Sequence, residues 1–343
     1  MTACPAEPRK RMGEFDRIER FFAKPAAALR LRLGQDAALL GIGDDCALVS
    51  PRSAAAIATG NSRSRGPWQS LAISSDMLVC GRHFASDVDP ESLGHKALAV
   101  NLSDLAAMGA EPLAFTLSLA IDTPQDDAWL ADFSRGLFSL ADSHRCELIG
   151  GDTTAGPLCV SLTVIGQLDA ALALRRDAAQ PGDQVWVSGE LGAAAFALKY
   201  PGVSTEARER LDWPEPRVEL GMALRGLSAC AIDLSDGLLG DIVHVLERSR
   251  VGIVLYAERI PTHEALRACE PNERLELALQ GGDDYELLFT AAPAMGPAIE
   301  RLSRNCGLRL SCIGEITADH RRDILDARGV ALDLAFRGFD HFK

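Results

Sequence analysis

Five short acidic motifs constrain this chain more than any other feature, because each of them adjoins an apolar stretch that is typical of a β-strand. Each motif is built from aspartate and small residues. They are Gly43-Asp44-Asp45, Ser74-Ser75-Asp76, Gly150-Gly151-Asp152-Thr153, Asp233-Leu234-Ser235-Asp236-Gly237 and Gly282-Asp283-Asp284. A single Gly-Asp pair is usually only a turn. Five such motifs at predicted strand ends instead indicate a fold that gathers carboxylates in one place.

The chemistry of a gathered carboxylate set is restricted. A buried carboxylate is costly unless it takes up a proton, finds a partner or binds a metal ion. Hard oxygen ligands suit Mg²⁺, which proteins hold with a few carboxylates together with water and substrate phosphates. Neighbouring glycines allow the backbone to approach a phosphate closely. The motifs therefore predict a site for magnesium ions and phosphate groups.

The charge of the chain excludes some partners. The 343 residues carry a formal net charge of −13, and an acidic surface repels nucleic-acid phosphate, so we expect no nucleic-acid partner. No stretch approaches the roughly 20 apolar residues of a membrane span, so no membrane partner is expected. The N-terminus lacks the apolar core of a signal peptide, which favours a cytoplasmic location. A chain this acidic needs bound cations if it is to handle phosphates.

The order of apolar and polar stretches predicts an α/β (α+β) protein with two domains. A composition shift near residues 175–183 places the boundary between an N-terminal domain, 1–170, and a C-terminal domain, 171–343. Helices are predicted over 1–35, 91–109, 125–145 and from 237 to about 250. Strands are predicted on both sides of the 43–45 motif, directly after the 282–284 motif, and over 71–73, 113–121, 147–149, 160–168, 184–188 and 230–232. Residues 51–69 are predicted to form an exposed loop.

Single residues leave alternatives open. Asp104 falls in the apolar stripe of the helix predicted over 91–109, where it can pair with Lys96, sit at the edge of the stripe, or join the metal site. Ser235 or Asp236 can cap the helix that follows, whatever else it does. His83 is more often structural than functional on such evidence.

The common phosphate-binding signatures are missing from the sequence. There is no G-x-x-x-x-G-K-[ST] loop, no H-R-D or D-F-G element of protein kinases, and no G-x-G-x-x-G motif after a strand. Any phosphate chemistry therefore depends on the acidic motifs.

Several segments together resemble the thiamine-monophosphate kinase family, in that family's order. They are GEFDRIERFF (13–22), GIGDDCALV (41–49), ISSDMLVCGRHF (73–84), KALAVNLSDLAAMGAEP (96–112), LIGGDTTAGPL (148–158), AIDLSDGL (231–238), GGDDYELLF (281–289) and FRGFDHF (336–342). This family belongs to the aminoimidazole-ribotide-synthetase-like superfamily. The resemblance implies a two-domain α/β fold and a homodimer formed through the N-terminal sheets.

The resemblance also implies a reaction, in which ATP and thiamine phosphate give ADP and thiamine diphosphate with the help of several Mg²⁺ ions. The implied metal site consists of Asp45, Ser74, Ser75, Asp76, Asp104, Asp152, Asp233 and Asp236. The implied ATP contacts are Gly151, Asp152, Arg176 and Ser235. The implied thiamine phosphate site consists of His83, Asp283 and Phe339.

The chain departs from the family pattern at two positions of the implied acceptor site. Position 283 is Asp where many relatives carry Glu, and position 339 is Phe where relatives carry another aromatic residue. Three alternative functions remain: another ATP-dependent enzyme of the superfamily, a metal-dependent phosphohydrolase, and a non-catalytic protein that binds a nucleotide or thiamine diphosphate. Selenophosphate synthetase is disfavoured, because no cysteine stands in a Gly-rich N-terminal loop.

Overall fold

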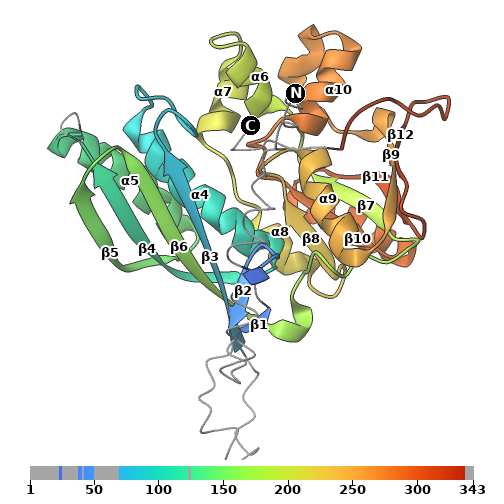
Figure 1. Cartoon of the computed structure of the whole chain (residues 1–343), viewed down its shortest axis with the longest axis horizontal. Helices are drawn as coiled ribbons and strands as arrows, with labels where there is room; N and C mark the ends of the chain where they lie inside the picture. The colour runs from blue at the N-terminus through green and yellow to red at the C-terminus, as the bar shows by residue number, and fades with distance from the viewer. Residues whose placement is uncertain (1–22, 25–37, 41, 50–68, 123–124, 337–343) are drawn as a thin grey trace, which may run out of the picture.

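A computed structural model describes residues 23–24, 38–40, 42–49, 69–122 and 125–336 of the chain. It contains two six-stranded sheets that lie on either side of a central helix, α4 (Figure 1). Almost all of the helix predicted over 1–35, most of the loop predicted over 51–69, and Phe339 lie outside the described residues. None of the described helices is both long enough and apolar enough to span a membrane.

The N-terminal sheet has the strand order β1-β2-β3-β6-β4-β5. Its strands are β1 (Ala38–Leu40), β2 (Ala47–Val49), β3 (Gln69–Val79), β4 (Glu111–Ile121), β5 (Glu147–Ala155) and β6 (Cys159–Asp169). Helices α4 (Pro90–Ala107) and α5 (Asp127–Ser143) pack together on one face of this sheet (Figure 1). Residues of β6 alternate between buried and half-buried positions, as expected for a strand with only one covered face.

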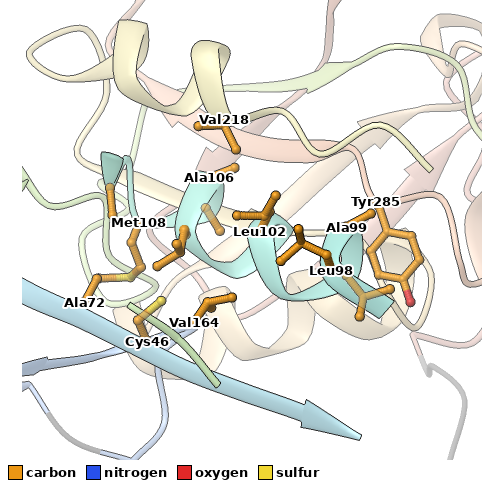
Figure 2. Packing of buried hydrophobic residues seen from close by; sticks show 14 of the residues in the cluster. Cys46, Ala72, Leu98, Ala99, Leu102, Ala106, Met108, Val164, Val218 and Tyr285 are labelled. Carbon is orange, nitrogen blue, oxygen red and sulfur yellow. The ribbon is translucent and has the colours of Figure 1, made fainter. Parts of the chain in front are cut away.

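Helix α4 is defined by local signals and is buried between the two sheets. The Asp89 side chain accepts a hydrogen bond from the backbone N–H of Ser92 at 2.8 Å, and Pro90 occupies the first turn. Val218 of α8 (Val218–Leu224) lies on one side of the helix and Val164 of β6 on the other (Figure 2). Polar residues on such a helix can therefore contact both halves of the protein.

The C-terminal sheet has the strand order β12-β9-β11-β7-β10-β8 and is antiparallel except between β12 and β9. Its strands are β7 (Gln184–Ser188), β8 (Cys230–Asp233), β9 (Gly252–Tyr256), β10 (Leu287–Ala291), β11 (Leu310–Thr317) and β12 (Arg322–Leu325). Its other helices are α6 (Ala193–Lys199), α7 (Thr205–Asp212), α9 (Leu238–Ser249), α10 (Pro271–Gln280) and α11 (Gly296–Cys306). Short 3-10 helices cover Ala170–Leu172, Ala257–Arg259, Glu264–Ala268 and Pro293–Met295.

Two of the five acidic motifs are not strand ends, and that prediction was wrong. Residues 74–76 lie inside β3, which pairs with β6 along its whole length. Residues 150–153 lie inside β5, which pairs in parallel with β4. Each motif pairs with one neighbouring strand, residues 74–76 with β6 and residues 150–153 with β4, so the extended conformation continues through them.

Candidate active site

Three carboxylates meet at the junction of the two sheets. Asp45 belongs to the turn between β1 and β2, Asp104 to α4, and Asp233 to the last position of β8. One oxygen of each lies within 4.8 Å of the others. Asp45 and Asp233 are buried, and Asp104 is half-buried. Segments far apart in the sequence thus bring three negative groups to one point.

Two serines fix this cluster to the surrounding elements. The Ser74 hydroxyl on β3 donates a hydrogen bond to Asp104 Oδ2 at 2.6 Å. The Ser103 hydroxyl on α4 donates to Asp233 Oδ2 at 2.8 Å. Because Ser103 and Asp104 are neighbours on one helix, α4 holds the N-terminal sheet and the end of β8 in a fixed relation.

The 74–76 motif contributes to this site through one face of β3. Side chains alternate along a strand, so Ser74 and Asp76 share the face toward α4 while Ser75 lies on the other face. The backbone N–H of Asp76 donates to Asn101 Oδ1 at 3.0 Å, which anchors the strand to α4. The Ser75 hydroxyl instead donates to the carbonyl oxygen of Leu162 on β6 at 2.8 Å. The structure therefore brings Ser74 and Asp76 toward the cluster, but not the Ser75 side chain.

The electrostatics of the cluster favour a bound cation. Burial raises the pKa of Asp104 well above its ordinary value, and the charges of Asp76, Asp233 and Asp45 raise it further. Burial likewise raises the pKa of Asp233, with Asp45 as the next cause. Carboxylates that disfavour their own ionisation in this way are stabilised by an added positive charge.

Arg176 supplies part of that positive charge. Its guanidinium donates two hydrogen bonds to Asp45, from Nε to Oδ2 at 2.9 Å and from Nη2 to Oδ1 at 2.6 Å. Its backbone N–H donates to Asp44 Oδ2 at 3.2 Å. Burial and the neighbouring Asp45 nevertheless raise the pKa of Asp44 to about 7. One arginine thus offsets Asp45, and the negative charge of the other carboxylates remains.

The acidic segments 233–237 and 281–284 pack against each other by their backbones. The N–H of Asp283 donates to the carbonyl oxygen of Ser235 at 2.8 Å. A Cβ atom at Gly282 would lie 2.4 Å from that oxygen, so the close approach requires glycine. The buried Asp241 carboxylate accepts a hydrogen bond from the N–H of Asp236 at 3.1 Å and supports the same loop. Both segments are therefore held beside the cluster.

The predicted capping role of Ser235 or Asp236 was wrong. Gly237 is the residue at the N-cap position of α9, and no side chain caps the helix. The reason is that the backbone contacts with 281–284 already fix the loop ahead of the helix. Both side chains are half-buried next to the cluster, so their role as ligands stays a prediction.

A pocket lies about two to three helical turns away from the cluster along α4. Segment 83–88 and the first part of α4 form one wall, and residues of α6 and α7 form the other. His83 lines the pocket, and its Nδ1 atom accepts a hydrogen bond from the N–H of Val79 at 2.9 Å. Lys96 also lines the pocket and forms an ion pair of 3.0 Å with Asp283. The alternative that Lys96 pairs with Asp104 was wrong, because eight residues of helix separate them by about 12 Å.

Gly151 and Asp152 lie away from this site within one chain. They belong to β5, the edge strand, which is separated from β3 by β6 and β4. Strands are about 4.8 Å apart, so this separation is about 14 Å. Asp152 is also exposed. The structure of the single chain therefore does not bring these two residues to the cluster.

Comparison with known proteins shows the family to which the chain belongs. Residues 43–168 match the N-terminal domain of AIR synthase related proteins, and residues 180–326 match their C-terminal domain. The chain is 40% identical to the thiamine-monophosphate kinase of Escherichia coli (strain K12) in an alignment of 341 residues that covers 96% of this chain and 98% of that protein. The chain belongs to the thiamine-monophosphate kinase family.

Other members of the kinase family are similar over most of their length. The thiamine-monophosphate kinase of Bacillus subtilis (strain 168) is 32% identical over 319 residues, which cover 89% of this chain and 94% of that protein. The crystal structure of thiamine-monophosphate kinase from Stenotrophomonas maltophilia K279a has a TM-score of 0.72 at 40% identity and covers 91% of this chain and 98% of that one. AaThiL complexed with AMPPCP and TMP has a TM-score of 0.76 at 26% identity and covers 97% and 99%.

In this family member, sequence reasoning missed several residues that shape the site. They are Asp44, Lys96 in its contact with Asp283, Asn101, Ser103 and Asp241. Helical spacing was the available signal for two of them, because Asn101 and Ser103 lie within one turn of Asp104 on a helix that the sequence already predicts. The Lys96–Asp283 contact joins positions 187 residues apart and has no local signal.

Proposed function

We propose that this chain transfers the γ-phosphoryl group of ATP to thiamine phosphate and so forms thiamine diphosphate and ADP. The observation that carries this proposal is the cluster of Asp45, Asp104 and Asp233, within 4.8 Å of one another at the junction of the two sheets. The names of the curated relatives and the AMPPCP and TMP complex of AaThiL support the same reaction.

The residues present fit magnesium ions. The cluster offers hard carboxylate oxygens, and burial and mutual repulsion raise the pKa values of Asp104 and Asp233, so a divalent cation would relieve an existing electrostatic cost. When bound, Mg²⁺ would neutralise phosphate charge and hold the attacking and leaving oxygens in line. The proposed ligands at the cluster are Asp45, Ser74, Asp76, Asp104, Asp233 and Asp236. Asp152 is proposed as a ligand only at the site of a second copy, and the Ser75 side chain, which bonds to β6, does not support the role predicted for it.

Protein side chains then have to bind and orient the two anions. Thiamine phosphate has a second phosphate pKa of about 6 and is mostly a dianion at pH 7, so no general base is needed. Arg176 is proposed to place its fixed positive charge beside the nucleotide phosphates, together with Ser235, Gly151 and Asp152. His83, Asp283 and Phe339 are proposed to bind the acceptor, and the pocket near the start of α4, which His83 lines, is its proposed place.

We also propose that the domains divide near residues 170–171.

A further proposal is that two copies of the chain pair through their N-terminal sheets. Met77 on β3 and Ile149 on β5 are 56% and 55% exposed, which is unusual for apolar side chains in a sheet. A second copy over this sheet would cover them. The ATP contacts proposed for Gly151 and Asp152 would then be made to the site of that copy.

One assay separates this function from its rivals. Purified protein is incubated with Mg²⁺ and ATP, with and without thiamine phosphate, and both ADP and thiamine diphosphate are measured. We expect equal amounts of the two products, and neither of them when the acceptor is left out or when the metal is chelated. ATP consumption that does not depend on thiamine phosphate would indicate a phosphohydrolase. Binding without turnover would indicate a non-catalytic protein.

A further inference from the structure

The Lys96 ammonium group lies at the wall between the acceptor pocket and the acidic loop 281–284. Lys96 is only 6% exposed, and its Nζ atom donates to the carbonyl oxygen of Leu211 on α7 at 3.1 Å and to Asp283 Oδ2 at 3.0 Å. The same lysine lines the pocket together with His83. A strongly hydrated cation is therefore held out of water beside the place proposed for the acceptor.

The partner of Lys96, Asp283, is held by a hydrogen bond at each of its two carboxylate oxygens. Asp283 Oδ1 accepts a hydrogen bond from the Tyr285 hydroxyl at 3.0 Å, while Oδ2 is bound by Lys96. The backbone of Asp283 has φ 66° and that of Tyr285 has φ 48°, in the left-handed region that residues other than glycine rarely occupy. Such strain persists where the surroundings fix it, and it concentrates at functional sites.

A contribution to the stability of the fold does not by itself explain why Lys96 and Asp283 form a buried ion pair. A buried pair of opposite charges is often no more stable than a well-packed apolar pair of the same size. Placement gives a better reason, because Lys96 precedes Asp104 by eight residues on one rigid helix, which is about 12 Å. The helix thus sets the distance between the carboxylates of the cluster and Lys96, which lines the acceptor pocket and holds Asp283 beside it.

We propose that Lys96 is a positioning residue for the acceptor. It holds Asp283 in one orientation, so that the acceptor meets a carboxylate whose charge is already balanced and whose free lone pairs accept hydrogen bonds. Asp283 therefore recognises an N–H group of the acceptor, such as the amino group of thiamine phosphate, and not its cationic ring. This inference rests on the proposed function, because it assigns the pocket to thiamine phosphate.

The test compares Lys96→Met, Asp283→Asn and the double variant with the unchanged protein. Lys96→Met should raise KM for thiamine phosphate about tenfold, with KM for ATP changed less than about twofold, because only acceptor binding depends on the pair. The double variant should be little worse than either single variant, since the two residues act as one unit. Lys96→Arg keeps the charge and should recover part of the loss.

Lys199→Met is the matched control, because Lys199 also forms an ion pair, with Glu273, but is 51% exposed and does not line the pocket. It should leave both KM values unchanged. A Lys96→Met protein whose two KM values rise together, or whose KM for thiamine phosphate is unchanged, would overturn the proposal. Calorimetric titration of thiamine phosphate into the same variants measures binding without turnover. Failure of the kinase activity and failure of the positioning role are therefore distinguishable outcomes.

Discussion

Removing one charge from the carboxylate cluster should stabilise the protein when no divalent metal is present. Asp104 and Asp233 have oxygens within 4.8 Å of each other, while Asp45 is already offset by Arg176. Two unit charges at 4.8 Å in an effective dielectric constant of about 20 repel each other by about 3.5 kcal/mol. Partial protonation lowers this value, so Asp104→Asn should raise the free energy of unfolding by about 1–3 kcal/mol. The Asn oxygen can still accept the hydrogen bond from Ser74.

The assay is thermal unfolding at pH 8 with a chelator and then with Mg²⁺. For domains of this size, 1 kcal/mol corresponds to about 2–4 °C, so Asp104→Asn should raise the Tm of the metal-free protein by about 2–12 °C. Mg²⁺ should stabilise the unchanged protein much more than the variant, because the variant has lost a ligand. Asp142→Asn, which alters an exposed aspartate on α5, is the control. It should change neither the Tm of the metal-free protein nor the increase in Tm caused by Mg²⁺. An Asp104→Asn protein that is no more stable without metal, and is stabilised equally by Mg²⁺, would refute this reasoning.

The stability of the metal-free protein should also depend on pH in a defined direction. Burial raises the folded-state pKa values of Asp104 and Asp233, and that of Asp44 is about 7 against an unfolded value of about 3.9. The folded protein therefore binds more protons than the unfolded chain between these values, and stability falls as the pH rises from about 4 through 7. The advantage of Asp104→Asn should be largest at pH 8 and should shrink toward pH 5.

Three further substitutions test separate parts of the site. Asp76→Asn should abolish turnover in a protein that still unfolds cooperatively, and near-normal activity would remove Asp76 from the cation site. Arg176→Lys keeps the charge but loses the paired bonds to Asp45, so KM for ATP should rise about tenfold; an unchanged KM would contradict the role of the guanidinium. Phe339→Ala should raise KM for thiamine phosphate, because stacking on a cationic ring contributes about 0.5–2 kcal/mol. An unaltered KM would place Phe339 outside the acceptor site.

Local patterns predicted the elements that local interactions define. The helix predicted over 91–109 is observed as Pro90–Ala107, because Asp89 and Pro90 start it and the positive φ of Gly109 follows its end. The lengths of β3 and β5 could not be predicted in this way. Both strands run through small polar residues because a neighbouring strand pairs with them, and the pairing partner is not visible in the local sequence.

In the candidate site, too, the local sequence predicted some features and contacts between distant segments determined the others. Asp45, Asp104 and Asp233 were predicted to share one site, and the structure places them within 4.8 Å, although their role as magnesium ligands stays a prediction. The predicted pairing of Lys96 with Asp104 was wrong, because contacts between distant segments decide which carboxylate a buried ammonium group contacts. Sequence patterns thus indicated which residues belong to the site, and packing between distant segments decided which of these residues contact each other.

A metal-binding experiment would decide whether these aspartates gather cations. Crystals grown with Mn²⁺, AMPPCP and thiamine phosphate would locate the metal through its anomalous scattering. We expect manganese within about 2.5 Å of oxygens of Asp45, Asp104 and Asp233, and in contact with the nucleotide phosphates. Manganese found only elsewhere, with the nucleotide far from these three carboxylates, would contradict the proposed role of the cluster.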